Sequence, residues 1–317
     1  MILVTGATGF VGGAVVRRLA IECGSSDVVA AVRRTDTSWP EGVQPVQTGE
    51  LLPTTDWSAA LRGVRAVVHC AARVHVMSEK SSDPLTEFRQ VNVEGAVNLA
   101  LQAAAAGVRR FIFLSSIKVN GESTELGRPF TANDVPAPED PYGISKHEAE
   151  KSLRFISSET GMEVVIIRSP LVYGPGVKAN FESMMRWLAR GVPLPLAAVT
   201  ENRRSFVALD NLVDLTVTCL NHPAAANQTF LVSDGEDLST ADLLKRMGAA
   251  LGQPARLFYI PLALLKLGGT ITRKPGIYRR LCGSLQLDIA KTRQLLGWTA
   301  PVSVNDGLRR AAEGSRQ

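Results

Sequence analysis

Met1-Ile2-Leu3-Val4-Thr5-Gly6-Ala7-Thr8-Gly9-Phe10-Val11-Gly12 opens the chain and decides its fold. A short apolar run leads into three evenly spaced glycines, and a helical pattern follows from Val11 to Ala20. In such a turn the first glycine permits the tight bend and the second lets a pyrophosphate approach the backbone. The third lets the helix pack closely on the strand. Because free N–H groups at a helix start attract phosphate, the stretch predicts a dinucleotide-binding turn.

The next 160 residues alternate between strand and helix signals. Short β-branched runs predict strands, and helix-length segments lie between them. Continuous apolar strands that alternate with helices indicate a parallel sheet covered on both faces. We therefore expect an α/β Rossmann domain, doubly wound, over residues 1–169. The predicted strands are Val28–Val32, Ala66–Cys70, Phe111–Leu114 and Val164–Ile167, and the clearest helices are Glu87–Ala106 and Pro141–Ser157.

The pattern changes after Ser169, where prolines and glycines cluster. Helical segments near Phe181–Arg190, Asp210–Leu220 and Thr240–Leu251 surround a strand-like Thr229–Val232. We expect a smaller, mostly helical substrate lobe over residues 170–317. The two lobes are expected to interleave in part, because Val207–Leu220 is apolar enough to pack back on the sheet.

Composition excludes several classes of protein. The chain of 317 residues is 45% hydrophobic and carries a net charge of +5, which suits anionic ligands but is too small and scattered for nucleic acid. Its four cysteines lack zinc spacing, so we expect no metal site and a reduced, cytoplasmic setting. A cleaved leader would remove the first strand, so we expect none. No apolar stretch reaches the roughly 20 residues of a membrane span. The basic, apolar Leu262–Arg280 suits either contact with a membrane surface or a helix that covers the second lobe.

The end of the second strand predicts the cofactor. An acidic residue there would favour NAD, but this chain has Val32-Arg33-Arg34 and no acid before Asp36. Arginine pairs well with phosphate, so we predict NADP(H), with Arg33 or Arg34 on the 2′-phosphate. If both arginines are only solvated surface charges, NAD remains the alternative.

Tyr142, Lys146 and Ser116 form a candidate catalytic set. Asp140-Pro141 is a good helix start, so Tyr142 and Lys146 share one helix face, roughly 6 Å apart along its axis. A phenol ordinarily has a pKa near 10, which a neighbouring ammonium lowers. Ser116 follows a buried strand at the sheet edge where α/β folds bind ligands, so its hydroxyl can hold a substrate oxygen beside Tyr142.

Taken together, these motifs resemble the extended short-chain dehydrogenase/reductases, in the nucleotide-sugar branch that includes UDP-galactose 4-epimerase. The glycines, Val67–Ala72, Ser115-Ser116 with Gly121, Tyr142/Lys146 and Arg168–Pro175 occur in that family's order. The resemblance implies that Ser116, Tyr142 and Lys146 are catalytic and that Asn92 supports the site. It also implies pairing into a homodimer through a four-helix bundle made partly by the Tyr142 helix. The expected cofactor-binding residues are Gly6, Thr8, Gly9, Phe10, Val11, Gly12, Arg33, Arg34, Glu50, Leu51, Cys70, Ala71, Ala72, Asn92, Tyr142, Lys146 and Pro170.

The resemblance places a UDP-sugar in the second lobe. Asn180-Phe181 resembles the family's pair at the diphosphate and uracil, and Arg204 resembles its diphosphate-binding arginine. Arg280 is expected to do similar work. Lys118 is expected either to point at the substrate or to be a solvated or structural lysine.

Departures from the family pattern separate the possible reactions. The 4,6-dehydratases carry Asp-Glu after the catalytic hydroxyl, whereas this chain has Ile117 and Lys118. Asn120 and Leu171 stand where epimerases often have Tyr and Asn. Ser115–Glu122 resembles 4-ketoreductases of O-antigen synthesis, which make UDP-N-acetylquinovosamine or its fucosamine epimer. The main expectation is NADPH-dependent reduction of a UDP-linked 2-acetamido-4-keto-2,6-dideoxyhexose at C4. The alternatives are a UDP-hexose 4-epimerase (UDP-glucose or UDP-N-acetylglucosamine) with tightly bound NAD and a non-catalytic NADP-binding regulator.

Overall fold

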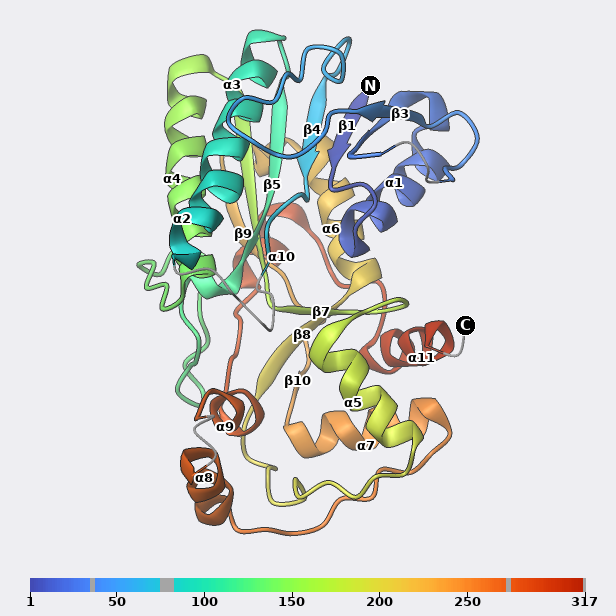
Figure 1. Cartoon of the computed structure of the whole chain (residues 1–317), viewed down its shortest axis with the longest axis vertical. Coiled ribbons are helices and arrows are strands. Elements are labelled where there is room, and N and C mark those ends of the chain that lie inside the picture. The colour runs from blue at the N-terminus through green and yellow to red at the C-terminus, as the bar shows by residue number, and fades with distance from the viewer. Residues whose placement is uncertain (35–37, 75–82, 272–274, 316–317) are drawn as a thin grey trace.

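The computed structural model describes residues 1–34, 38–74, 83–271 and 275–315, with side chains omitted over 268–277. It has two lobes (Figure 1): a large sheet with helices on both faces occupies the upper part of the view, and a smaller lobe occupies the lower part. Among the described residues, no helix is both long and apolar enough to cross a bilayer.

The main sheet has seven strands, all parallel, in the order β3-β2-β1-β4-β5-β6-β9. Side chains alternate along each strand, so Ile2 and Val4 face one hydrophobic cluster while Leu3 faces another. Both faces are therefore apolar, and both need helices. The strands are β1 (Ile2–Thr5), β2 (Val28–Val32), β3 (Gln44–Gln47), β4 (Ala66–His69), β5 (Arg110–Ser116), β6 (Glu163–Ser169) and β9 (Thr229–Leu231).

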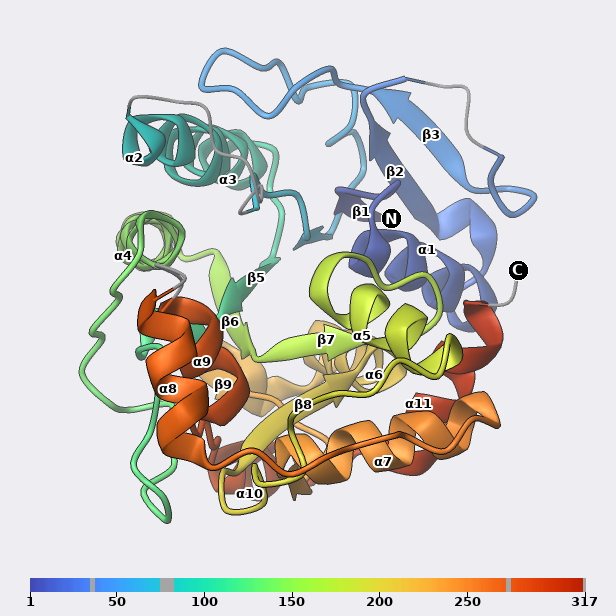
Figure 2. The same ribbon diagram turned by 60° about the horizontal axis from the view of Figure 1, so that its bottom comes forward.

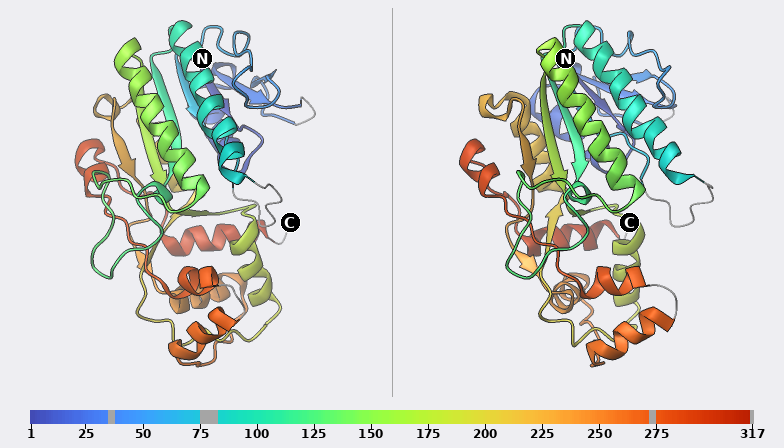
Figure 3. Two further views of the ribbon diagram at one scale, coloured as in Figure 1. Left: turned by 60° about the vertical axis from the view of Figure 1, so that its left-hand side comes forward. Right: turned by 90° about the vertical axis from the view of Figure 1, so that its left-hand side faces the viewer.

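Helices cover both faces of this sheet. The cluster on one face takes in residues of α1 (Phe10–Glu22), α6 (Leu209–Asn221) and α10 (Ala290–Leu296). The other face is covered by α3 (Ala96–Ala105) and α4 (Pro141–Thr160), which run side by side (Figure 3). The expected doubly wound α/β fold is confirmed.

The smaller lobe has its own core and a sheet of three short strands in the order β10-β8-β7. Its helices surround that sheet, and α8 and α9 lie together at one end (Figure 2). The expected mostly helical lobe is confirmed. Its strands are β7 (Leu171–Tyr173), β8 (Arg204–Ala208) and β10 (Asp237–Leu238), and its helices are α5 (Ala179–Ala189), α7 (Thr240–Leu251), α8 (Leu262–Ile271), α9 (Pro275–Cys282) and α11 (Val304–Gly314).

The structure differs from expectation at three places. The strand expected within the second lobe, Thr229–Val232, is β9 of the main sheet, so the chain returns to the first lobe after β8. The exposed edge strand β3 carries Gln44, Pro45 and Gln47 and gave no apolar signal. The single helix expected over Glu87–Ala106 is α2 (Pro84–Phe88), a π-helical segment Arg89–Gly95, and α3.

Candidate active site

The glycine turn between β1 and α1 packs tightly at Gly6 and Gly12 and leaves space beside Gly9. Gly6 has a φ of +64°, and a Cβ there would lie 2.8 Å from the amide nitrogen of Ala71. A Cβ on Gly12 would lie 2.2 Å from the carbonyl oxygen of Gly6. A Cβ on Gly9 would have only the Gly6 oxygen nearby, at 3.0 Å, so its outer side is open. A dinucleotide phosphate fits this arrangement, because α1 begins after Gly9 without a side-chain cap to satisfy its first N–H groups.

Thr5 ties the turn to the end of β4. Its hydroxyl shares a 2.7 Å hydrogen bond with Nδ1 of His69 and accepts one from the amide of Ala71 at 3.3 Å. Burial lowers the pKa of His69 to about 3 and raises the pKa of the Cys70 thiol to about 12. Cys70 and Ala71, both expected to line the cofactor, thus lie in an uncharged wall against the glycine turn.

Other expected cofactor residues lie around the same sheet edge. Arg33 and Arg34 are exposed directly after β2, while Asp36 lies outside the described residues. Glu50 is exposed. Leu51 packs closely against Gly95, because a Cβ added to Gly95 would lie 2.8 Å from Leu51 Cγ. The roles of these residues in cofactor binding stay predictions.

The turn that follows Ser116 packs against the start of α4, which carries Tyr142. Ser116 ends β5, and its Oγ accepts a hydrogen bond from the amide of Lys118 at 3.3 Å. A Cβ on Gly143 would lie 2.8 Å from the carbonyl oxygen of Lys118, so glycine is needed beside Tyr142 for this close packing. Asp140 caps α4 by accepting from the amide of Gly143 at 2.7 Å.

Lys146 is buried and Tyr142 is half-buried, and burial shifts their pKa values in opposite directions. Burial, together with the charge of Asp140, raises the pKa of Tyr142. Burial lowers the pKa of Lys146 to about 8, although the charge of Glu150 opposes this change. The Lys146 ammonium donates to the carbonyl of Leu114 at 2.7 Å and lies 4.2 Å from the ring centre of Phe113.

Asn92 supports this set from the π-helical segment. Its amide nitrogen donates to Ser145 Oγ at 3.0 Å, and Ser145 in turn donates to the carbonyl of Tyr142 at 2.8 Å. Its amide oxygen accepts from the backbone of Arg73 at 2.8 Å. The π-helical turn, a feature often found at functional sites, thus carries Asn92 close to the catalytic helix.

Lys118 is held by acidic neighbours. Its ammonium pairs with Asp140 and, at 3.0 Å, with Glu122. Burial alone would lower the pKa of Lys118, but the hydrogen bonds to both carboxylates outweigh burial and raise it. The structure thus gives Lys118 a contact with the cap of the catalytic helix, and its substrate contact stays a prediction.

Sequence reasoning missed a buried ionic network under the catalytic residues. Glu150, one turn after Lys146 on α4, accepts two hydrogen bonds from Arg168, at 2.9 and 2.6 Å, and both residues are buried. Glu150 also accepts from Ser115 Oγ at 2.6 Å, and Arg168 donates to Asn120 at 2.9 Å. The spacing of Glu150 four residues after Lys146, on the same helix face, is the signal that could have found it.

The expected substrate residues of the second lobe differ in their surroundings. Phe181 is buried and stacks on Tyr173 at 5.4 Å, so its side chain belongs to the lobe's core. Asn180 and Arg280 are exposed. Arg204 begins β8, where burial lowers its pKa, and its guanidinium donates to the carbonyl of Gly283 at 3.1 Å. A partly buried guanidinium with a carbonyl partner suits an anionic ligand, and this role stays a prediction.

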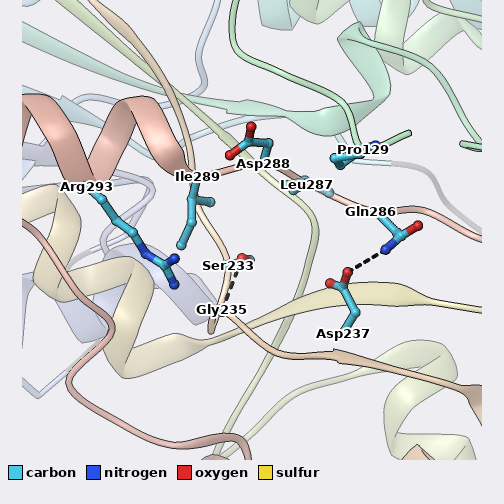
Figure 4. A pocket seen from close by; sticks show the side chains of 9 residues that line it. All are labelled: Pro129, Ser233, Gly235, Asp237, Gln286, Leu287, Asp288, Ile289 and Arg293. Atoms are coloured by element: carbon cyan, nitrogen blue, oxygen red, sulfur yellow. Dashed lines mark hydrogen bonds between the residues drawn. The ribbon is translucent and has the colours of Figure 1, made fainter. Parts of the chain in front are cut away.

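A separate cavity of about 250 Å³ lies between the segment 233–237 and the segment 286–293 (Figure 4). Gln286 donates to Asp237 at 2.9 Å on its wall, and Arg293 points into it. It shares no residue with the catalytic set, so we assign it no part in the chemistry. Its lining is Pro129, Ser233, Gly235, Asp237, Gln286, Leu287, Asp288, Ile289 and Arg293.

Comparison with known proteins identifies the class that this fold and site define. The NAD dependent epimerase/dehydratase family matches residues 2–233, and the chain belongs to that family. The expected relationship to the extended short-chain dehydrogenase/reductases is confirmed.

Particular relatives share nearly the whole chain. It is 48% identical to a UDP-glucose 4-epimerase of Vibrio cholerae over 316 residues, which are 100% of this chain and 95% of that protein. It is 26% identical to N-acetyl-alpha-D-glucosaminyl-diphospho-ditrans,octacis-undecaprenol 4-epimerase of Escherichia coli O157:H7, covering 98% and 94% of the two chains. The solved structure of MoeE5 in complex with UDP-glucuronic acid and NAD matches with a TM-score of 0.77 at 25% identity, covering 99% and 98%.

Proposed function

We propose that this protein interconverts the C4 epimers of a UDP-linked hexose, with NAD as its resident cofactor. The observation that carries the proposal is the 48% identity to a UDP-glucose 4-epimerase over the whole chain. It is supported by the candidate catalytic residues: Ser116 ends β5 at the carboxyl edge of the parallel sheet, and Tyr142 and Lys146 lie one turn apart on α4. This reverses the preference for ketoreduction that was drawn from Arg33 and Arg34 and from the Ser115–Glu122 stretch.

The chain's own residues supply the proton chemistry of this proposal. A nicotinamide cofactor held at the glycine turn would supply reversible hydride transfer at the sugar C4, with removal from one face of that carbon and delivery to the other. Tyr142 Oη takes the proton of the C4 hydroxyl and later gives it back, while Ser116 Oγ holds the same oxygen. Because burial favours the neutral phenol, a positive charge beside it is needed, and the Lys146 ammonium supplies that charge.

One specific observation favours a second candidate, NADPH-dependent reduction of a UDP-4-keto sugar. Arg33 and Arg34 follow β2 directly, and both are exposed where a cofactor's ribose phosphate would be read. NADPH serves net reduction, whereas an epimerase returns its hydride to the same sugar. In this second proposal Tyr142 donates its proton to the new C4 hydroxyl and Ser116 again holds the oxygen.

Two assays on the purified protein separate the candidates. In the first, UDP-glucose is supplied without added reductant, and NMR follows the appearance of UDP-galactose. In the second, the UDP-linked 4-keto sugar is supplied with NADPH, and absorbance at 340 nm is followed. Epimerisation predicts interconversion in the first assay. If the first assay stays silent while NADPH is consumed and a 4-hydroxy sugar forms, the ketoreductase proposal replaces it.

A further inference from the structure

Exposed apolar side chains gather at the far end of the second lobe. Six of the fifteen large apolar residues that are exposed in the described part of the chain lie there, including Tyr259 at 71% and Leu264 at 57% exposure. We call this surface the apolar end; it comprises Trp187, Phe258, Tyr259, Leu262, Leu264 and Leu267. Single exposed apolar residues are ordinary, whereas such a concentration marks an interaction surface.

Backbone hydrogen bonds hold the parts of the apolar end together. The amide of Leu194 donates to the carbonyl of Arg256 at 2.9 Å, and the amide of Phe258 donates back to Leu194 at 3.0 Å. Val192, close to that pairing, donates to the carbonyl of Trp187 at 3.0 Å. The loop then leads directly into α8, at the end of the lobe that Figure 2 brings forward.

Among the described side chains of helix α8, Leu265 anchors the helix to the lobe. Leu265 is half-buried and packs on the lobe's core. At about 100° per residue, Leu267 lies nearly opposite Leu265 around the helix and Leu264 lies on its flank, and both are exposed. The helix thus presents an apolar face outward and an anchoring face inward.

Basic residues dominate the sequence segments that form the apolar end, although Arg186, Arg246 and Arg279 pair with Glu182, Glu236 and Glu139. The sequence holds eight Lys and Arg residues and no Asp or Glu between Asp242 and Asp288. Between Glu182 and Glu201 it holds two arginines and no acid. Since the whole chain carries a net charge of only +5, the remainder is net acidic. Arg190 and Lys266 are exposed within these two segments.

We propose that the apolar end docks on the surface of an anionic phospholipid bilayer. Tyr and Trp side chains favour the water–lipid interface, and a short helix with an outward apolar face lies in its plane. Basic residues near anionic headgroups add binding that salt screens. A symmetric contact with a second copy would instead set two basic surfaces against each other. The proposal uses none of the catalytic residues and is independent of the proposed function.

Vesicle co-sedimentation of the full-length protein tests this proposal. One set of vesicles is phosphatidylcholine alone, and the other contains equal parts of phosphatidylcholine and phosphatidylglycerol. We expect the protein to sediment with the anionic vesicles at low salt, and to bind roughly tenfold less at about 0.5 M NaCl, where charges are screened within a few ångströms.

Variants locate the contact. Leu264→Ser with Leu267→Ser should weaken partitioning roughly tenfold, because apolar burial in the interface is lost. The matched control is Leu126→Ser with Val135→Ser, two apolar residues in another part of the chain that are more exposed than Leu264 and Leu267. This control should bind as the parent does. Arg190→Gln with Lys266→Gln should reduce binding to anionic vesicles. Unchanged thermal unfolding of each variant shows that its fold is intact.

The proposal is overturned if the protein stays in the supernatant with anionic vesicles at low salt. It is also overturned if the variant pair at 264 and 267 binds no worse than the control pair. Loss of self-association in that variant, measured by light scattering without any vesicle binding by the parent, would assign the apolar end to a second copy.

Discussion

At the scale of single residues, Tyr142 and Lys146 show what burial does to a proton-transfer pair. Enclosure raises the pKa of Tyr142 and lowers the pKa of Lys146, so both shifts favour the neutral forms. The pair lies one turn apart on α4, and the Lys146 ammonium is steadied by the Leu114 carbonyl and the Phe113 ring. The site is therefore shaped to accept a further charge from its ligands.

Tyr142→Phe tests the proton transfer itself. We expect turnover to fall by about 10² to 10⁴, the usual contribution of a general acid–base group, while dinucleotide binding changes little. Steady-state kinetics and cofactor titration measure the two effects, and Tyr278→Phe in α9 serves as the control. A Tyr142→Phe protein with undiminished turnover would remove the residue from the mechanism. Retention of a biological role without turnover would favour the regulator.

Lys146→Met tests the cost of the buried amine. The pKa of Lys146 is about 8 in the folded protein, against an ordinary value of 10.5 that applies to the unfolded chain. Between these values the unfolded chain binds a proton that the folded chain does not, so this group makes stability rise with pH. Below pH 8 the full penalty applies. Methionine should therefore stabilise the ligand-free protein by up to about 3 kcal/mol at pH 7, and the gain should vanish above pH 10.5.

Urea unfolding at pH 7 and at pH 10 measures this effect, with Lys151→Met on the exposed side of α4 as the control. The same Lys146 variant should lose most turnover, because its positive charge is gone. A variant less stable than the parent at pH 7 would show that the contacts of Lys146 with Leu114 and Phe113 outweigh its burial cost.

At the scale of elements, the β1–α1 turn depends on one close approach. Gly12→Ala would place a methyl group 2.2 Å from the Gly6 oxygen, whereas the Cβ of Gly13→Ala would lie 3.1 Å from the Ala7 oxygen. We expect the first variant to lose about 2 kcal/mol or more and to bind dinucleotide poorly, because α1 must move outward. The second should remain near the parent. Thermal unfolding with and without cofactor compares them, and equal behaviour of the two variants would contradict this account.

The buried pair Glu150–Arg168 joins α4 to β6 under the catalytic set. Glu150→Gln leaves Arg168 buried without its counter-ion, so we expect a loss of about 3 to 5 kcal/mol. Glu148 lies on the same helix as Glu150 and pairs with Arg89 of the π-helical segment, but both of these side chains are partly exposed. We therefore expect Glu148→Gln to lower the free energy of unfolding by less than about 1 kcal/mol. Denaturant unfolding ranks the two variants. Equal losses of stability would mean that burial does not determine how much the Glu150–Arg168 pair contributes.

Local signals predicted some elements to the residue and missed others for physical reasons. β2 (Val28–Val32) and α7 (Thr240–Leu251) lie where the pattern placed them, because a buried strand and a capped amphipathic helix leave dense local signals. β9 was visible as a strand, but local sequence does not say which sheet a strand joins. β3 is exposed at an edge, so it needs no apolar residues.

The residues of the candidate site likewise fall into those that the local sequence predicted and those that it missed. Tyr142 and Lys146 come from one helix and one spacing, which the sequence displays directly. Glu150 and Arg168 come from different elements, and a polar residue in the sequence carries no mark that it is buried. The close approach of Lys118 to Gly143 depends on tertiary packing, and so does the π-helical turn that carries Asn92.

At the scale of the whole molecule, the chain passes back and forth between the two lobes. After β8 in the smaller lobe the chain returns as α6 and β9 to the main sheet, and then leaves again for α7. Segments of both lobes therefore depend on each other for their position. The chain also passes between the lobes from β6 to β7 and on both sides of α10, so the lobes are joined at several connections.

The outer face of α3 and α4 carries two exposed large apolar side chains, which suggest how the protein assembles. Leu101 on α3 is 51% exposed and Phe155 on α4 is 66% exposed, and the two helices run side by side (Figure 3). We propose that this face pairs with its copy in a homodimer. Light scattering should then give about twice the chain mass of 34.0 kDa. Leu101→Glu with Phe155→Glu should give a folded monomer, because like charges would meet across the symmetric contact. Ile21→Glu, equally exposed on α1 across the sheet, should leave the dimer intact. A dimer that survives the double change, or a monomeric parent, would place assembly elsewhere.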